Sequence, residues 1–125
     1  MKKLLIIIIL IFSTQSVQSQ ECNLNPERGS KNYIIGYGSL MDKESRLRTN
    51  KSAFVVKPIL IKGFERTWGL NGGMYKITFL TIIKKENSFV NAVYYPVSIK
   101  DLNKTDKRES GYCRVKVKGK DLSFY

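Results

Sequence analysis

An uninterrupted apolar run near the N-terminus limits how much of this chain can fold into a domain. Leu4 to Phe12 are nine consecutive apolar residues, preceded by the basic start Met1-Lys2-Lys3 and followed by small and polar residues at 13–20. This is the layout of a secretory signal peptide. The run is too short for a membrane-spanning helix, which needs about 20 apolar residues. The sequence therefore predicts an exported protein, periplasmic or secreted.

Cleavage of the signal peptide, residues 1–19, is predicted after Ser19, because Val17 and Ser19 fill the small-residue positions that precede a cut. A retained N-terminal anchor is the alternative. Without the signal peptide, no stable membrane insertion is expected. The rest divides into a polar leader at 20–31 and one domain at 32–125, which is long enough for a single modest core.

The charge of the chain is strongly positive. The net charge is +12, and removal of Lys2 and Lys3 with the signal peptide leaves +10. Such a field favours anionic partners, including nucleic acid, anionic lipid, cell-wall polymers and acidic metabolites. The basic residues are scattered rather than gathered in a block. A solvated basic surface is therefore favoured over specific nucleic-acid binding.

The chain has no histidine. This excludes the usual Ser-His and Cys-His catalytic pairs and histidine-ligated metal sites. A catalytic base must then be Asp, Glu, Lys, Tyr or Cys. The two cysteines, Cys22 and Cys113, can form one disulfide in an exported protein. A nucleophilic Cys113 is the disfavoured alternative, because no histidine can activate it.

Hydrophobic patterning predicts an α+β fold with a curled antiparallel or mixed sheet. Asp42 and Ser98 occupy N-cap positions of two short helices, and Pro58 indicates a bent or edge strand. The predicted strands are 33–37, 53–61, 75–83, 89–97 and 111–118, the helices 42–48 and 98–107, and the turns 66–74 and 84–88.

The segment at 36–40 follows a buried strand and leads into a helix. Gly36 and Gly38 permit unusual backbone angles and close approach of a ligand. Backbone N–H groups at such a turn can bind a carboxylate, a phosphate or an oxyanion. The alternative is an ordinary strand-to-helix turn. A P-loop is excluded, because the Gly-Lys-Ser/Thr ending is missing.

A second cluster, DKRESGYCR, spans residues 106–114. Glu109 stands where a helix gives way to a strand, next to Gly111 and Tyr112. A carboxylate at such a junction can be partly desolvated, which raises its pKa towards a value useful for a base. The alternative is a surface acid paired with Lys107 or Arg108.

Together the two clusters resemble the γ-glutamylcyclotransferase-like family. The resemblance covers about residues 33–118. It rests on Tyr37-Gly38-Ser39-Leu40-Met41, on Asp106, Arg108, Glu109, Gly111, Tyr112 and Arg114, and on the intervening segments KGFERTW (62–68) and FVNAVYYPV (89–97).

The resemblance implies a small mixed, mostly antiparallel β-barrel flanked by short helices. It implies cleavage of a γ-glutamyl amide by intramolecular attack, which releases 5-oxoproline and an amine or amino acid. Tyr37 to Leu40, with Tyr112, would bind the γ-glutamyl group, and Glu109 would be the catalytic base. The reaction requires no metal and no cofactor. A non-catalytic module that binds γ-glutamyl groups or anions, and a basic protein that binds nucleic acid or surface polymers, are the alternatives.

Overall fold

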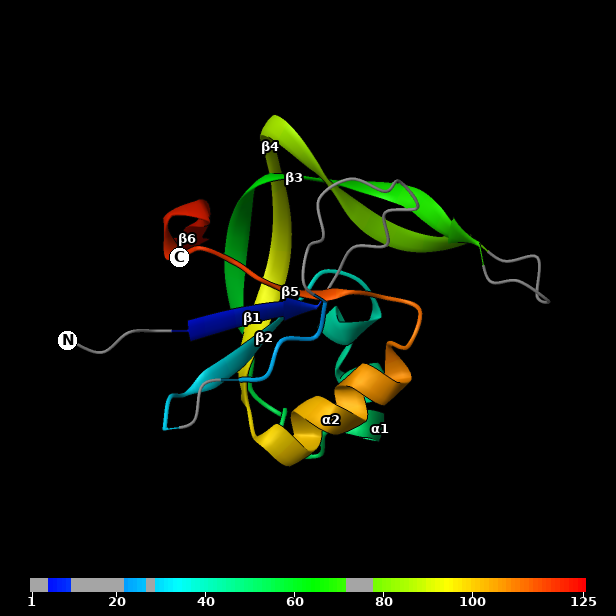
Figure 1. Ribbon diagram of the computed structural model, residues 1–125, viewed down its shortest axis with the longest axis vertical. Coiled ribbons are helices and arrows are strands. Elements are labelled where there is room, and N and C mark those ends of the chain that lie inside the picture. The colour runs from blue at the N-terminus through cyan, green and yellow to red at the C-terminus, as the bar shows by residue number, and fades with distance from the viewer. Residues whose placement is uncertain (1–4, 10–21, 27–28, 72–77) are drawn as a thin grey trace.

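Six strands form one sheet in the computed structural model, which describes residues 5–9, 22–26, 29–71 and 78–125 (Figure 1). The strands are β1 (Leu5–Ile9), β2 (Asn32–Gly36), β3 (Lys57–Asn71), β4 (Thr78–Val97), β5 (Arg114–Lys116) and β6 (Leu122–Phe124). Their order across the sheet is β5-β1-β2-β4-β3-β6. β1 runs parallel to β2, and all other neighbouring pairs are antiparallel. The expected mixed α+β architecture is confirmed.

The two α-helices lie together beside the sheet (Figure 1). They are α1 (Lys43–Thr49) and α2 (Ile99–Arg108). The Asp42 carboxylate accepts a 2.7 Å hydrogen bond from the Ser45 N–H, and the Ser98 hydroxyl accepts one of 3.1 Å from the Asp101 N–H. These caps satisfy N–H groups that have no partner inside the helix. Both predicted helices are confirmed to within one residue. No helix in the described residues is long and apolar enough to span a membrane.

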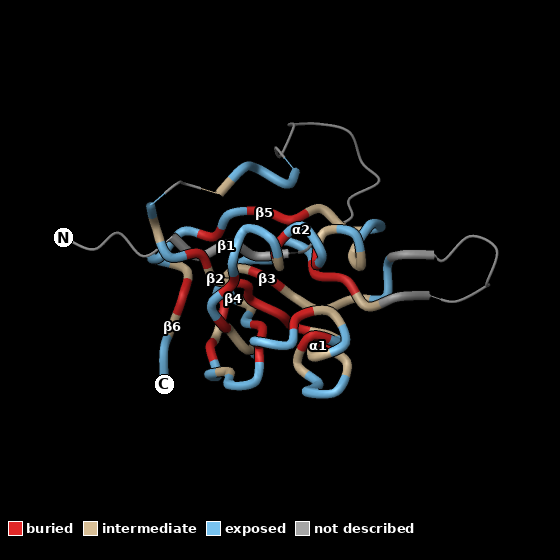
Figure 2. Tube along the Cα trace, turned by 90° about the horizontal axis from the view of Figure 1, so that it is seen from below, coloured by how far each residue is buried: buried red, intermediate tan, exposed pale blue. Residues whose placement is uncertain are grey.

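Buried apolar side chains form two clusters, concentrated on β2, β3 and β4 (Figure 2). One cluster, which includes Ile34, Tyr95 and Leu102, joins the sheet to the helices. The other contains Val115 of β5 and Leu122 of β6, which are the two edge strands. Opposite edges of the sheet therefore share one core, which requires the sheet to curl.

The curled sheet is open, so the expected closed β-barrel is wrong. β5 pairs with β1 and β6 pairs with β3, and no ladder joins β5 to β6 within the described part of the chain. Each of these edge strands has only three residues, and a 3₁₀ turn at Gly119–Asp121 separates them. β5 is shorter than the predicted strand 111–118, because the chain is still turning at Tyr112, whose N–H bonds the Glu109 carbonyl.

One predicted turn lies within a long strand, and the other lies partly within one. The hairpin-like turn expected at 84–88 lies inside β4, where the pairing changes register opposite Gly63. Gly63 has φ +82°, a conformation that glycine adopts without steric cost. Of the turn expected at 66–74, residues up to Asn71 belong to β3, and the rest lies outside the described residues. Sequence signals for turns thus mark bulges here.

The expected signal peptide and β1 involve the same residues. Leu5–Ile9 form β1, which lies between β2 and β5. Cleavage after Ser19 would remove this strand, and with it the ladder partner of β5. Further ties to β5 come from Asp106 of α2, whose carboxylate lies 2.9 Å from Arg114 Nε, and from residues 22–24, which follow the cleavage site. Backbone groups of Asn23 and Arg114 share a 2.9 Å hydrogen bond, and the Arg114 N–H donates to Asn23 Oδ1 at 3.0 Å.

A disulfide between Cys22 and Cys113 joins the same two segments across 91 residues of sequence. A crosslink over so long a loop restricts the unfolded chain strongly, and disulfides typically contribute about 2–4 kcal/mol. We expect Cys22→Ser/Cys113→Ser to lower the free energy of unfolding by that amount in urea titrations. Reductant should produce the same loss in the wild type and none in the double variant. Equal stability of oxidised and reduced wild type would contradict a structural role for the disulfide.

Candidate active site

The loop of the first motif is a 3₁₀ turn at Ser39–Met41 that follows β2. Gly36 allows this turn to fold back, because a Cβ at this position would lie 2.5 Å from Leu40 Cβ. A Cβ at Gly38 would meet only Leu80 Cδ2, at an ordinary 3.8 Å. Neither glycine has positive φ. Gly38 nevertheless has φ −119° and ψ −123°, outside the helical and extended regions, so the unusual backbone angles expected in this loop are found at Gly38. Gly36 serves packing of the loop on Leu40.

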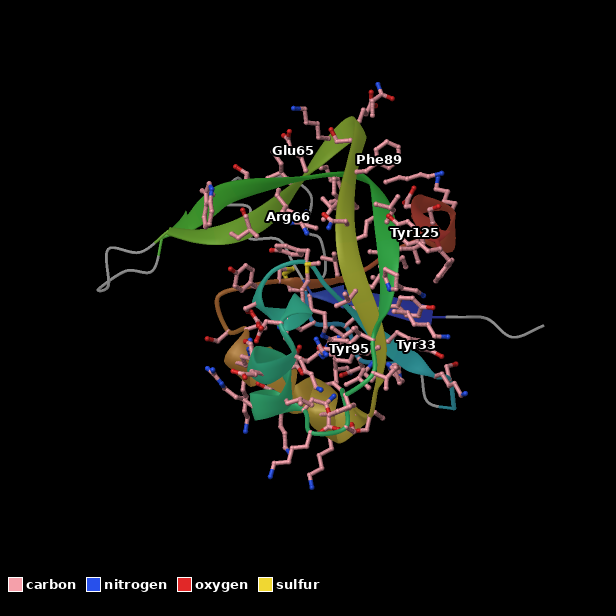
Figure 3. The ribbon with its side chains drawn as sticks, turned by 180° about the vertical axis from the view of Figure 1, so that it is seen from behind. Tyr33, Glu65, Arg66, Phe89, Tyr95 and Tyr125 are labelled. Atoms are coloured by element: carbon pink, nitrogen blue, oxygen red, sulfur yellow. A yellow bond between two sulfur atoms is a disulfide. The ribbon has the colours of Figure 1, made fainter. Side chains whose placement is uncertain are left out.

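Two arginines hold the loop through its carbonyl groups. Arg46, only 2% exposed, donates to the carbonyls of Leu40 at 3.0 Å, Met41 at 3.1 Å and Ala53 at 2.8 Å. Arg66 projects from β3 towards the loop (Figure 3) and donates to the Tyr37 carbonyl through Nε at 3.2 Å and Nη2 at 3.0 Å. Because the carbonyls of Tyr37, Leu40 and Met41 accept these hydrogen bonds, the backbone of the loop is held in one conformation.

The N–H groups of the loop at residues 38–40, unlike its carbonyls, are not bonded within the part of the chain that the structure describes. None of the hydrogen bonds among the described residues uses the N–H of Gly38, Ser39 or Leu40. The Leu40 side chain is buried in the core beside the helices, so this residue can serve a ligand only through its backbone. Unbonded N–H groups on a rigid turn form a suitable cradle for a carboxylate or an oxyanion.

Glu109 is the C-cap residue of α2, at the junction that the sequence indicated. Its side chain is largely buried, and its Oε1 lies 3.2 Å from Arg108 Nε. Burial raises the pKa of the Glu109 carboxyl above its ordinary value, while the Arg108 charge opposes part of that rise. Burial has the larger effect, because the charged carboxylate loses water that one cation does not fully replace. Glu109 is thus a carboxylate with enhanced basicity.

Tyr37 and Tyr112 meet at one backbone oxygen. Their hydroxyls both donate to the Leu80 carbonyl of β4, at 3.3 Å and 2.8 Å respectively. Burial raises the pKa of both phenols, and the negative charge of Glu109 raises each further. Both tyrosines therefore stay protonated and neutral beside the Glu109 carboxylate. Because the Glu109 charge acts on both phenols, and both phenols bond the same carbonyl, Tyr37, Tyr112 and Glu109 lie close together.

Arg108 connects this neighbourhood to the glycine-containing loop. Its Nη2 donates to the Ser39 hydroxyl at 3.1 Å, while its Nε faces Glu109. The structure thus brings together Tyr37, Ser39, Glu109 and Tyr112 from two motifs about 70 residues apart in the sequence. Cys113, next to Tyr112, is in the disulfide and has no free thiol. Within the described ranges, no group of three or more His, Cys, Asp or Glu residues could hold a metal ion.

No role was predicted for Arg46, Arg66 or Leu80. Arg108 was expected only as a possible pairing partner of Glu109, and the structure shows that pair. Arg66 and Arg108 stand inside the quoted motifs, but the loop and helix groups that they bond depend on the fold. Arg46 has no local signal, because a helical arginine is usually exposed. Leu80 contributes a backbone carbonyl, which carries no sequence signature.

The raised pKa of Glu109 predicts a pH-dependent stability difference between wild type and Glu109→Gln. Below the ordinary glutamate pKa of 4.5, the folded and unfolded wild type are both protonated at this residue. As pH rises, the unfolded chain releases the proton first, so the wild type loses stability. The neutral amide avoids this loss. We expect Glu109→Gln to become progressively more stable relative to wild type as the pH rises from 4 to 8.

Urea titrations at several pH values would measure this difference. Glu86→Gln is the matched control, because Glu86 is exposed on β4 and undergoes the same chemical change. Its stability difference from wild type should stay flat over the same pH range. A Glu109→Gln difference that is flat, or that moves in the opposite direction, would show that the site does not favour the protonated acid.

Neither a protein-family model nor a curated protein matches this sequence. Among solved structures, the chain is similar to the solution structure of At3g28950.1 from Arabidopsis thaliana, with a TM-score of 0.52 and 15% sequence identity. The match covers 74% of this chain and 64% of that chain, so this chain spans less than two thirds of that protein's length. At this identity the likeness shows the fold alone, and it supports the mixed α+β architecture.

Proposed function

We propose that this protein is an exported γ-glutamylcyclotransferase-like enzyme, with a γ-glutamyl amide as substrate and 5-oxoproline and an amine or amino acid as products. The motif resemblance suggests the reaction. The observation that carries the proposal is the placement of Glu109, a largely buried carboxylate of raised pKa, beside Tyr37, Tyr112 and the loop containing Ser39. The alternative, a surface acid paired with Lys107 or Arg108, agrees with the ion pair between Glu109 and Arg108 but not with the burial of the Glu109 side chain or with these neighbours.

The nucleophile in this reaction is the α-amine of the substrate. Its pKa is about 8, so near neutral pH most of it is protonated and cannot attack. Glu109 accepts one proton from the ammonium group and releases it to solvent, and the free amine then attacks the γ-carbonyl carbon. A new C–N bond closes the five-membered ring, Glu109 accepts a second proton from the ring nitrogen, and it passes this proton to the departing amine as the original amide C–N bond breaks. A carboxylate with a raised pKa suits these proton transfers.

The loop at Tyr37 to Leu40 would hold the substrate through its free N–H groups. These groups suit either the α-carboxylate of the γ-glutamyl group or the oxyanion that forms at the γ-carbonyl. Because nucleophile and electrophile belong to one molecule, the main requirement is a folded substrate conformation, and such positioning can contribute several kcal/mol. The carbonyl anchors from Arg46 and Arg66 give the loop the rigidity that this role needs.

The neutral tyrosines fit this scheme. A phenolate at Tyr37 or Tyr112 would add a negative charge next to Glu109 and would repel the substrate carboxylate. Their raised pKa values prevent that ionisation, and the shared Leu80 carbonyl fixes both rings. We assign both tyrosines to the wall of the γ-glutamyl site, without a proton-transfer step.

Export is part of this proposal and comes from the signal-peptide pattern at residues 1–19. If those residues are removed, Cys22 is still present, and its disulfide keeps the N-terminal end of the mature chain on Cys113. The intact mass of protein recovered from the periplasm or the medium tests this point. A mass that starts at Gln20 supports cleavage, while a full-length mass supports the retained anchor.

The enzyme is tested with a panel of γ-glutamyl amines, amino acids and short peptides, with 5-oxoproline and the released amine measured together. Equal molar amounts of the two products support the proposal. Glutamate in place of 5-oxoproline would indicate hydrolysis and contradict it. If no compound turns over but γ-glutamyl ligands shift the amide resonances of residues 38–40, the protein is a binding module. Binding only of nucleic acid or anionic polymer, lost steeply with salt, would favour the basic-surface alternative.

A further inference from the structure

Arg108 bridges several parts of the candidate site. Besides Ser39, its guanidinium donates to the Ser45 carbonyl, the Ser45 hydroxyl and the Thr49 hydroxyl, the last at 3.1 Å. The same side chain forms the ion pair with Glu109. One residue of α2 therefore contacts α1, the loop after β2 and the candidate base.

We propose that Arg108 is the positioning residue that fixes the distance and orientation between the Glu109 carboxylate and the substrate loop. This inference rests on the proposed function, because it assigns a role in the same site. A guanidinium is a planar fork with five N–H donors, so it can bond several acceptors in fixed directions. Here Nε is directed at Glu109, and the two terminal nitrogens are directed at Ser39, Ser45 and Thr49.

The covalent link between Arg108 and Glu109 makes this arrangement sensitive. The two residues are adjacent at the end of α2, where the last carbonyls of a helix have no partner within the helix. The Arg108 side chain, 21% exposed, compensates by fastening this helix end to α1 and to Ser39. Loss of these bonds would release Glu109 from the loop, and a displacement of about 1 Å at a reacting centre can reduce the rate about 100-fold.

Arg108 also moderates the basicity of Glu109. Burial raises the pKa of the Glu109 carboxyl, and the neighbouring guanidinium lowers it again. Removal of the guanidinium charge should therefore raise this pKa further, which moves the acid limb of the activity profile to higher pH. A residue with a purely structural role would change stability without moving that limb.

The test compares Arg108→Gln and Arg108→Lys with Lys107→Gln. Lys107 is exposed on the same helix turn, so its replacement removes an equal charge without contact to the loop. Carbon-detected NMR titration gives the pKa of the Glu109 carboxyl, and amide shifts report on Ser39 and Leu40. We expect Arg108→Gln to raise the Glu109 pKa, shift both amides and lower kcat/KM about 10- to 100-fold. Arg108→Lys should recover part of the pKa effect, and Lys107→Gln should resemble wild type.

Ser39→Ala provides a second route if Arg108→Gln does not fold. It removes one acceptor of Arg108 and keeps the arginine, so it should displace the Glu109 carboxyl resonance without altering the helix. The proposal is overturned if folded Arg108→Gln, or Ser39→Ala in its place, leaves the Glu109 resonance and pKa as in Lys107→Gln. The NMR readout needs no turnover. A wild type that releases no 5-oxoproline would therefore refute the proposed function while the Arg108 contacts are tested separately.

Discussion

Glu109→Gln should lower kcat/KM for 5-oxoproline release about 10²- to 10⁴-fold, the usual contribution of a positioned general base. The introduced glutamine has the size of the native glutamate, but its amide cannot accept the ammonium proton of the substrate. The variant should also keep the fold, because the Glu109 side chain is largely buried and a neutral amide of the same size costs less to bury than a carboxylate. A coupled assay of 5-oxoproline under kcat/KM conditions measures the effect.

Ligand binding to Glu109→Gln distinguishes a variant that has lost only the catalytic base from one whose binding site is disrupted. The loop N–H groups are unchanged in Glu109→Gln, so a γ-glutamyl ligand should shift the amide resonances of residues 38–40 as it does in the wild type. Glu86→Gln should keep wild-type activity, because Glu86 is exposed on β4. If Glu109→Gln retains activity within about threefold of wild type at the pH optimum, Glu109 is not the base, whatever the reaction.

Features with local causes could be predicted from the sequence. Asp42 and Ser98 cap their own helices within three residues, so both helix starts were correct. The prediction of strand β2 was correct, because a short apolar run bounded by turn residues favours a buried strand. The Cys22–Cys113 disulfide in the structure joins the two cysteines that the composition offered as a pair.

Features with distant causes could not be predicted. Gly69 lies in the turn predicted at 66–74, yet it stands inside β3, at a register shift and beside the Thr81 side chain. A glycine in a bulge and a glycine in a turn have the same local signal, and only the partner strand distinguishes them. Whether the sheet closes likewise depends on which strands pair with the short β5 and β6, and the sequences of β5 and β6 alone do not determine this.

The candidate site divides along the same line. Tyr37, Ser39, Glu109 and Tyr112 were predicted from motifs to belong to one site, and these four residues lie close together in the structure. The groups that position them include the Leu80 carbonyl and the Arg66 guanidinium, which reach the site only through pairing of β3 with β4. The side chains proposed to contact substrate thus stand in recognisable motifs, whereas the groups that hold them in place need not.

Arg46→Met should be the most destabilising single replacement near the site, with a loss of about 3–5 kcal/mol in the free energy of unfolding. Methionine fills a similar volume and keeps helix propensity. It leaves the carbonyls of Leu40, Met41 and Ala53 without the donor that bonds them now. The interaction of the Arg46 guanidinium with the Tyr95 ring, 5.6 Å from the ring centroid, is lost as well.

Arg48→Met on the same helix is the matched control, because Arg48 is exposed and its replacement removes the same charge. It should change stability by less than about 0.5 kcal/mol. The comparison distinguishes packing from charge. If the large loss came from net charge or helix dipole, the two variants would be alike, and if Arg46→Met lost less than about 1 kcal/mol, the loop carbonyls would not depend on Arg46. A large loss confined to Arg46→Met, with weaker γ-glutamyl binding in the folded fraction, would show that the backbone cradle depends on a buried cation behind it.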